Sequence, residues 1–357
     1  MEENKILENV PEEVVETPAV ETVEDLHGEN LNDRVRVLSP GMMVAKRFFR
    51  SKLSMLGLVI LIALFLFSFI GPMFSPWANG GQPVKDETPG APILSIKTFV
   101  YGEDITAYEI NETVPENNQF AELSPEHVLG TDNNGYDLFT NLMLGGRISL
   151  TIGFVVIIIE TLIGVVLGGL AGYFGGWVDN LVMRIVDIIS CVPTLPIMLI
   201  LSTTFTSLKI VDIRRLYYLM GVLTLIGWGG IARLVRGQIL SLREQDFMLA
   251  AKCSGLSTSR KIFRHLLPNV MPQLIVSMTM GLGSIILMEA TLGFLDLGAP
   301  LGTPTWGAMI NAAANMTYLS GYPNFWIPPG ICITLAILAF NFVGDGLRDA
   351  FDPKMKR

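Results

Sequence analysis

The sequence predicts an all-helical membrane protein with six transmembrane helices. Charged residues make up 16% of its 357 residues, whereas about a quarter is usual in soluble domains. The mean hydropathy is positive, at +0.48. A helix needs about 20 apolar residues to cross the hydrocarbon core of a bilayer, where its backbone groups must be satisfied internally. Six stretches meet this need, at residues 55–74, 148–171, 185–205, 216–234, 274–292 and 327–343.

The chain begins with an acidic segment. Residues 1–33 contain eleven Asp and Glu against one Lys, and no aromatic residue. Such a composition cannot bury enough apolar surface to offset the entropy lost on ordering, so we expect residues 1–41 to be a disordered cytoplasmic tail. No basic start or apolar core follows Met1, so a signal peptide is not expected.

Lys and Arg near the ends of the spans predict the orientation, because they favour the cytoplasmic side. One basic cluster precedes the first span, and another follows the sixth, on the same side after an even number of crossings. Both termini of this multi-pass protein of the plasma or inner membrane are therefore predicted to be cytoplasmic. The exception is a basic loop at residues 209–215, which this topology places outside. The supporting residues are Lys46, Arg47, Arg50, Lys52, Arg243, Lys252, Arg260, Lys261, Arg264, Arg348, Lys354, Lys356 and Arg357.

These spans divide the chain into segments. An amphipathic lead and the first transmembrane helix occupy residues 42–75, a core with five transmembrane helices occupies 148–345, and a second cytoplasmic tail occupies 346–357. Residues 76–147 are too long for a plain connector, so they form either a small folded extracellular excursion or a loosely ordered loop. No strand or helix is evident within them.

The fourth and fifth spans are joined by a basic loop, residues 239–272, which contains "AAKCSGLSTSRKIFRHLLPN". We expect a helix over residues 244–254, ended by Gly255 in the left-handed conformation. Ser257 or Thr258 then caps a second helix that reaches about residue 267, and Pro268 begins the next span.

The predicted helix–turn–helix would project into the cytoplasm as a knob. Ala250 and Ala251 lie on one side of the turn, and the apolar Leu256, Ile262 and Phe263 lie on the other. This shape suits insertion into a partner's groove. The alternative is an amphipathic loop that rests on the lipid surface.

Ionisable and polar residues inside spans are costly and indicate function by default. Glu160 lies mid-span and either lines a translocation path or makes a hydrogen bond between helices. Arg184 precedes Asp187 by one turn, which favours a local ion pair. Glu289 lies near the outer surface and faces either a cavity entrance or solvent. Asn341 is the fourth candidate for the path, although a hydrogen bond between helices is the simpler interpretation.

Several other residues indicate structure rather than chemistry. Pro193 and Pro196 are expected to kink the third span. Residues 294–326 contain aromatic side chains that favour the outer membrane interface, namely Trp306, Tyr318, Tyr322 and Trp326. The three cysteines are far apart, without metal-ligand spacing, and are interpreted as packing residues; they are Cys191, Cys253 and Cys332.

The motif search excludes several enzyme classes. The sequence contains no Gly-Lys dipeptide, so the phosphate-binding pattern GxxxxGK[ST] is absent, as are GxSxG and HExxH. An intramembrane aspartyl protease using Asp187 and Asp345 would need GxGD, but Phe342 replaces the first glycine. A secondary transporter is the other alternative, but no convincing internal repeat supports it.

The loop resembles a known motif. Ala250 and Ala251, then Gly255 after three residues, then the pair Leu267–Pro268 are similar to the EAA loop of ABC importer membrane subunits. Leu249 stands where that family has glutamate, and His265 where it has isoleucine. The resemblance implies a coupling helix that docks into an ATPase. It assigns the contact to Phe247, Leu249, Ala250, Ala251, Gly255, Leu256, Ser257, Arg264, His265 and Pro268.

Further motifs in the same order extend the resemblance to almost all of the chain after residue 42. They are "RFFRSKLSMLGLVIL", "HVLGTDNNGYDLFTNLMLGGRISLTIGF" with Tyr136 where arginine is usual, "YFGGWVDNLVMRIVDIISCVPTLP", "EATLGFLDLG", "WGAMI" and "NFVGDGLRDAFDP". The sequence is similar to the C-type permease subunits of dipeptide, oligopeptide and nickel importers.

This resemblance implies the type I ABC importer permease fold and a transport subunit that is not itself an enzyme. The implied partners are a homologous second permease, two ATPase subunits that use ATP and Mg²⁺, an extracellular binding protein, a peptide substrate and membrane lipid, with no nucleic acid. No cofactor is expected on this chain. The alternative cargo is a nickel chelate or a glutathione-like compound, but the candidate path residues include no His or Cys suited to bare nickel.

Overall fold

The computed structural model describes residues 40–77, 93–101, 104–112, 118–210, 213–299 and 302–352. Almost all of the acidic segment expected to be a disordered tail lies outside these residues, as does the end of the second tail. The compact unit that carries the candidate site spans Val44–Arg357.

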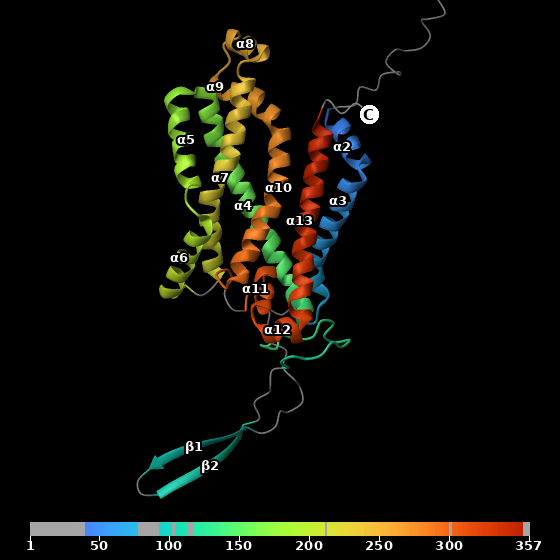
Figure 1. Cartoon of the computed structure of the whole chain (residues 1–357), viewed down its shortest axis with the longest axis vertical. Helices are drawn as coiled ribbons and strands as arrows, with labels where there is room; N and C mark the ends of the chain where they lie inside the picture. Colours follow the sequence, from blue (N-terminus) through green and yellow to red (C-terminus); the bar gives the residue numbers. More distant parts are fainter. Residues whose placement is uncertain are drawn as a thin grey trace, which may run out of the picture. The chain divides into compact units, whose positions relative to one another are not determined.

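Within the described residues, five helical segments are long and apolar enough to cross a membrane, and a bent helix pair makes six if it is one span. The fold class expected from the hydropathy is therefore confirmed (Figure 1). The first segment comprises α3 (Lys52–Phe65), a π-helical turn (Leu66–Ile70) and a 3₁₀ turn (Gly71–Phe74), and α2 (Pro40–Arg50) precedes it. The other four are α4 (Leu138–Phe174), α7 (Ile213–Leu242), α10 (Leu267–Phe294) and α13 (Pro323–Phe351).

The third predicted span is a broken helix. It consists of α5 (Gly176–Ser190) and α6 (Thr194–Ser207), bent by 72°. Pro193 is the N-cap of α6, where its ψ of 115° is extended, so the predicted kink is confirmed at Pro193. Pro196 lies in the first turn of α6 and does not break the helix. The predicted third span begins at residue 185, but the helix itself begins earlier, at Gly176. The preceding Gly175 has a φ of +66°, which lets the chain turn directly from α4 into α5.

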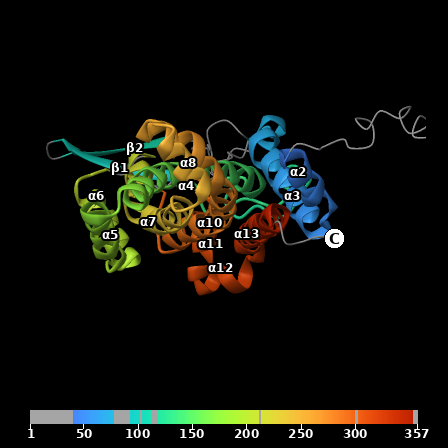
Figure 2. The ribbon, with the colours of Figure 1, turned by 90° about the horizontal axis from the view of Figure 1, so that it is seen from above.

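The helices pack in a row (Figure 2). The bent pair α5–α6 lies beside α7, α7 packs on α4, α4 on α10, α10 on α13, and α13 on α3. The buried core follows this row and includes Leu150, Ile157, Val235, Ile239, Leu282, Ile286, Ala336 and Phe340.

Glycine allows the close approach of α4 and α7. A Cβ added at Gly164 would lie 2.8 Å from Cβ of Ile231, and one at Gly168 would lie 2.9 Å from Cα of Ala232. Side chains larger than hydrogen would therefore separate the two helices. Gly168 thus permits the close approach, whereas a Cβ at Gly169 would make only ordinary contact, at 3.7 Å from Cδ1 of Ile239.

The segment after the first span contains a hairpin that the sequence did not indicate. Strands β1 (Ile93–Tyr101) and β2 (Asp104–Glu112) pair antiparallel, with Ile93 opposite Glu112 and Tyr101 opposite Asp104. Both strands contain β-branched and aromatic residues, which favour strands. No strand was evident in the sequence of residues 76–147, and the hairpin is therefore a feature that was not predicted. Residues 118–137 lead from this segment into α4, which begins at Leu138, upstream of the predicted span.

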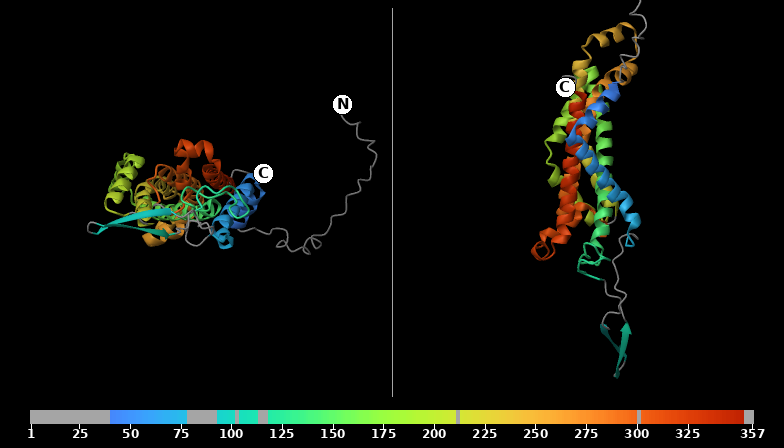
Figure 3. Two further views of the ribbon diagram at one scale, coloured as in Figure 1. Left: turned by 90° about the horizontal axis from the view of Figure 1, so that it is seen from below. Right: turned by 90° about the vertical axis from the view of Figure 1, so that its right-hand side faces the viewer.

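Three short helices connect α10 to α13. They are α11 (Trp306–Ile310), a 3₁₀ turn (Asn311–Ala314) and α12 (Met316–Gly321). They lie at one end of the bundle, and α8 and α9 lie at the other (Figure 3). Helix α10 links the two ends and, at 28 residues, is about 42 Å long.

Candidate functional site

A knob of two short helices stands between α7 and α10. It comprises α8 (Asp246–Cys253), α9 (Thr258–Arg260) and a π-helical turn (Lys261–Leu266), and we call residues 246–266 the knob. It lies beyond the end of the long helices (Figure 1). The helix–turn–helix expected from the sequence is present at this position.

The turn has the geometry expected of a glycine helix end. Gly255 has a φ of +65°. Its amide donates to the carbonyl oxygen of Lys252 at 3.1 Å, and the amide of Leu256 donates to that of Ala251 at 3.3 Å. These two bonds form a Schellman motif. The Ser257 hydroxyl accepts from the amide of Arg260 at 3.5 Å and caps the second helix.

The second helix does not end before the membrane span. The backbone continues from α9 through the π-helical turn into α10, where Pro268 lies in the first turn. Proline is tolerated there because the first amides of a helix need no partner within it. The helical backbone of the knob is therefore continuous with α10.

The knob presents some apolar side chains and buries others. Leu249 is 60% exposed, Phe263 is 62% exposed and Phe247 is 37% exposed. Met248 is completely buried and Ala251 is 5% exposed. Ala250 and Ala251 thus differ, because only Ala251 faces the base of the knob. Met248 packs in the main core with Leu266 and Val270, which fixes α8 to the start of α10.

The remaining predicted coupling residues surround the turn. Ser257, Arg264 and Pro268 are exposed, whereas Leu256 and His265 are half-buried. The backbone carbonyl of His265 accepts from the Asn269 amide group at 2.6 Å. All ten residues predicted for the contact therefore lie in one small region, but Ala251 is not on its surface.

Asp187 pairs with Arg233 of α7, not with Arg184. Arg233 Nη2 lies 3.0 Å from Asp187 Oδ1 and donates to the Ser190 hydroxyl at 3.0 Å. The predicted local pair with Arg184 is wrong, because α7 brings a guanidinium beside α5. The side chains of Arg233 and Asp187 are 46% and 59% exposed.

A second ion pair joins the same two helices. The guanidinium of Arg236 makes a bidentate contact with the Asp179 carboxylate, with Nη2 donating to Oδ2 at 2.6 Å. The sequence analysis missed Arg233 and Arg236. The signal available was their spacing of three residues, which places both on one face of α7.

Glu160 is buried between α4 and α7. It is only 7% exposed, and its carboxylate lies directly against Gly227 of α7. No hydrogen bond from the described part of the chain reaches its carboxylate, so the expected hydrogen bond between helices is not formed there. Asn341 of α13 is half-buried and likewise makes no side-chain hydrogen bond to the described residues.

Glu289 is buried, contrary to both expectations for it. It is 3% exposed, and its Oε2 accepts from the Ser149 hydroxyl of α4 at 2.8 Å. The backbone amide of Trp306 donates to the same hydroxyl at 3.2 Å. Oε1 has no hydrogen-bond partner among the described residues. Glu289 therefore faces neither solvent nor a cavity entrance, because α4 and α11 enclose it.

Trp306 is fully buried within the protein, and its indole Nε1 donates to the carbonyl oxygen of Leu142 at 3.0 Å. This residue therefore joins α11 to α4, and its interfacial depth stays a prediction. Tyr318 and Tyr322 form an aromatic cluster with Phe120 and Phe325, with ring centroids 5.0 to 6.1 Å apart.

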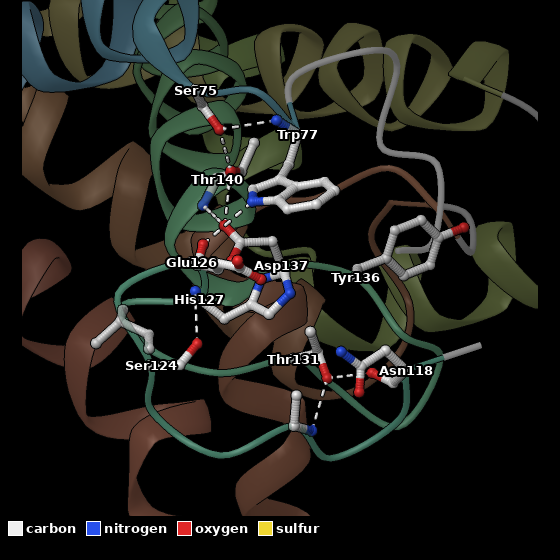
Figure 4. A network of polar contacts seen from close by, with 12 residues as sticks. Ser75, Trp77, Asn118, Ser124, Glu126, His127, Thr131, Tyr136, Asp137 and Thr140 are labelled. Carbon is white, nitrogen blue, oxygen red and sulfur yellow. Dashed lines mark hydrogen bonds and ion pairs between the residues drawn. The ribbon is translucent and has the colours of Figure 1, made fainter. Parts of the chain in front are cut away.

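A buried His–Asp pair organises the loop before α4 (Figure 4). His127 Nδ1 lies 3.0 Å from Asp137 Oδ1. The other carboxylate oxygen, Oδ2, accepts from the Thr140 amide at 2.8 Å and caps α4. The His127 ring lies 4.9 Å from that of Trp77. Nothing in the sequence spacing of His127 and Asp137 indicated this pair.

The basic loop that contradicts the predicted topology has a structural role. Arg215 Nη2 donates to the Ser202 hydroxyl at 2.6 Å and to the carbonyl oxygen of Asp296 at 3.1 Å. These bonds join α7, α6 and the end of α10. Arg215 is therefore placed by hydrogen bonding, which explains a basic residue at this end of the bundle.

The cysteine interpretation is partly wrong. Cys332 is buried and packs in the core, but Cys191 and Cys253 are exposed. All three are free thiols. Within the described residues, no group of His, Cys, Asp or Glu has an arrangement that suits a metal ion.

A multi-span apolar helix bundle with ion pairs between its helices and a helical knob at one end defines a multi-pass membrane protein. Residues 164–357 match the family described as "binding-protein-dependent transport system inner membrane component", and residues 39–88 match the N-terminal transmembrane domain of oligopeptide transport permease C. The chain belongs to this family. It is the permease component of an ABC transporter, a multi-pass inner membrane protein that is not itself catalytic.

Curated relatives cover nearly the whole chain. It is 35% identical to the oligopeptide transport system permease protein OppC of Bacillus subtilis over 98% of this chain and 100% of that protein. It is 33% identical to the dipeptide permease DppC of Alkalihalophilus pseudofirmus, over 91% of this chain and 93% of that protein. It is 36% identical to DppC of Bacillus subtilis, over 87% of this chain and 85% of that protein. An inward-facing structure of the MetNI methionine ABC transporter covers 59% of this chain and 96% of its own, at 20% identity and a TM-score of 0.47.

Proposed function

We propose that this chain forms half of the path of an ATP-driven peptide importer, with the knob as its contact with an ATPase subunit. The observation that carries the proposal is the knob, which is anchored in the core yet exposes Leu249 and Phe263. Relatives named as oligopeptide and dipeptide permeases support peptide as the cargo over a nickel chelate.

The exposed residues of the knob fit an apolar groove. Leu249 replaces the glutamate usual at its position, so docking here uses shape and apolar contact in place of a carboxylate. Phe247 and Phe263 add to the apolar surface that Leu249 presents. The partners are two ATPase subunits that use ATP and Mg²⁺, a homologous second permease, and a binding protein that delivers substrate.

The knob passes movement into the membrane through two helices. It is continuous with α10, and Arg243 at the end of α7 donates to the carbonyl oxygen of Gly172 on α4 at 3.0 Å. When nucleotide closes the ATPase subunits, their grooves displace the two knobs of the permease pair. The attached helices then alternate the side to which the path is open.

The path is proposed to run beside the Asp187–Arg233 pair. This pair is about half exposed although it lies within spans, and charges at that depth need water or a protein partner. Glu160 and Glu289 are assigned instead to contacts between helices, because other helices cover them, and the half-buried Asn341 is assigned to the same role. Both termini and the knob are proposed to be cytoplasmic, since the basic residues cluster at that end.

Reconstitution of the complete importer in liposomes tests the function. Binding protein and labelled dipeptide or oligopeptide are supplied on one side, and ATP on the side of the ATPase subunits. We expect uptake that needs ATP, the binding protein and the ATPase subunits together. Gradient-driven uptake by the permeases alone would contradict the proposal and indicate a secondary transporter.

A further inference from the structure

A cavity of about 250 Å³ lies at the end of the bundle opposite the knob. Three segments enclose it: the loop before α4, the connection after α10, and the region from α11 to α12. These segments are far apart in sequence, and they meet because Trp306 joins α11 to α4. The cavity is thus held by the packed core.

The lining of this cavity is acidic, amide-rich and aromatic. The two ionisable carboxyl side chains are Asp132 and Asp296, and the described lining residues include no Lys, Arg or His. The amide side chains are Asn133, Asn134, Asn141 and Asn311, and the aromatic rings are Tyr136, Tyr318 and Phe325. Carboxylates, amide oxygens and ring faces all attract a cation.

The carboxylates lack a cationic partner within the described residues. Asp132 Oδ1 accepts from the backbone amides of Asn134 and Tyr136, both at 2.8 Å. Burial raises the pKa of the Asp132 carboxyl, although these backbone hydrogen bonds oppose the shift. Arg215 lies near, but it donates to the backbone carbonyl of Asp296 and not to the carboxylate. The negative charge of the lining is therefore not neutralised by this part of the protein.

Asp296 occupies a position where glycine is usual. It follows α10 with a φ of +58°, its amide donates to the carbonyl oxygen of Gly293 at 3.0 Å, and the next amide donates to that of Leu292 at 2.9 Å. This is a second Schellman motif, with aspartate in place of glycine. Aspartate is one of the few non-glycine residues that adopt this conformation, and here it places an exposed carboxylate residue at the cavity wall.

We propose that this cavity binds a primary ammonium group. The inference rests on the proposed function, which supplies two sources of this chemistry: the free amino end of the peptide and a lysine side chain of the binding protein. An alkylammonium suits this lining, because Asp132 and Asp296 offer carboxylates to its charge and Tyr318 and Phe325 offer aromatic rings to its carbon chain.

The test uses the whole importer with a double substitution, Asp132→Asn and Asp296→Asn. At position 132 the asparagine keeps an oxygen acceptor for the two backbone amides, and at position 296 it tolerates a positive φ, so charge is removed with the backbone retained. The single variant Asp296→Asn guards against misfolding at position 132. Glu122→Gln is the matched control, because Glu122 is exposed in the same loop and does not line the cavity.

Two measurements separate the sources. One is the Kd of peptide-loaded binding protein for the importer in nanodiscs, and the other is ATP-driven peptide uptake with binding protein in excess. If the ligand is a lysine, the double variant raises that Kd about tenfold. If the ligand is the peptide's amino end, the Kd is unchanged and uptake falls about tenfold. This magnitude is that of hydrogen bonds to a charged group.

Unchanged Kd and uptake in both variants would overturn the inference. Failure of the proposed function is distinguishable, because the native importer would then show no ATP-driven uptake of peptide at all.

Discussion

The amide of Leu256 donates to the carbonyl oxygen of Ala251 at 3.3 Å, and this bond closes the turn of the knob. It forms only because Gly255 between them has a φ of +65°. Apart from the chain neighbours of Gly255, no atom of the described residues lies within 4 Å of a Cβ added there. A side chain there would therefore act on the backbone conformation and not on packing.

Gly255→Val should impair coupling. The left-handed conformation costs an ordinary side chain about 1–2 kcal/mol, and a β-branched one more. We expect ATP-driven uptake in liposomes to fall at least about fivefold, with ATP hydrolysis no longer stimulated by the binding protein. Gly255→Asn is the control, since asparagine adopts this conformation, and it should retain most uptake. Equal uptake by the Val variant and the native chain would rule out a role for this turn.

Neighbouring glycines of α4 should respond in opposite ways. A Cβ at Gly168 would lie 2.9 Å from Cα of Ala232, whereas one at Gly169 makes ordinary contact. Gly168→Ala should destabilise the protein by about 1–3 kcal/mol, the usual cost of overpacking. Gly169→Ala should be neutral or stabilising by up to about 1 kcal/mol, because alanine favours helix. Thermal unfolding in detergent measures both, and a similar Tm for the two variants would disagree with the close α4–α7 contact.

Ser149 should contribute more than another hydroxyl of the same helix. Its oxygen donates to Glu289 and accepts from the Trp306 amide. Ser149→Ala leaves buried polar groups unpaired and should destabilise the protein by about 1–3 kcal/mol. Thr151→Ala is the control, because the exposed Thr151 bonds only to its own helix, at the carbonyl oxygen of Arg147. The same unfolding measurement applies, and equal effects of the two changes would argue against the buried network.

The Asp187–Arg233 pair is expected to face water in the assembled importer. In a background with Cys191→Ser and Cys253→Ser, Asp187→Cys should react with a membrane-impermeant thiol reagent. Ile188→Cys is the control, since Ile188 is the next residue, is 67% exposed and is apolar. We expect Ile188→Cys to react at least about tenfold more slowly if lipid covers it, because a thiol buried in hydrocarbon does not ionise to the reactive thiolate. Equal protection of both cysteines would exclude a path at this pair.

The features that the sequence predicted correctly are those that depend on residues close together in the chain. Hydropathy identified the spans, and Gly255 and Ser257 identified the turn and cap of the knob, because each depends on neighbouring residues alone. The motif order after residue 42 predicted the family. These features need no knowledge of which helices meet.

Contacts between distant segments were not predictable from one sequence. Asp187 had a plausible partner one turn away in Arg184, but the packing of α7 on α5 brought Arg233 instead. Tryptophan is common at membrane interfaces, but Trp306 is buried in the core, where its indole N–H donates a hydrogen bond to a backbone carbonyl oxygen of α4. Burial of Ala251 and exposure of Leu249 likewise depend on how α8 rests on the start of α10.

Cross-linking of the knob to the ATPase tests the central claim most directly. Leu249→Cys is placed in the background that lacks Cys191 and Cys253, and the assembled importer is treated with a short bifunctional thiol reagent. We expect a cross-link to the ATPase subunit that changes with bound nucleotide. Met316→Cys, which is also well exposed but on α12 at the other end of α10, should give none. Absence of any cross-link from Leu249→Cys, or a cross-link from Met316→Cys alone, would contradict the account.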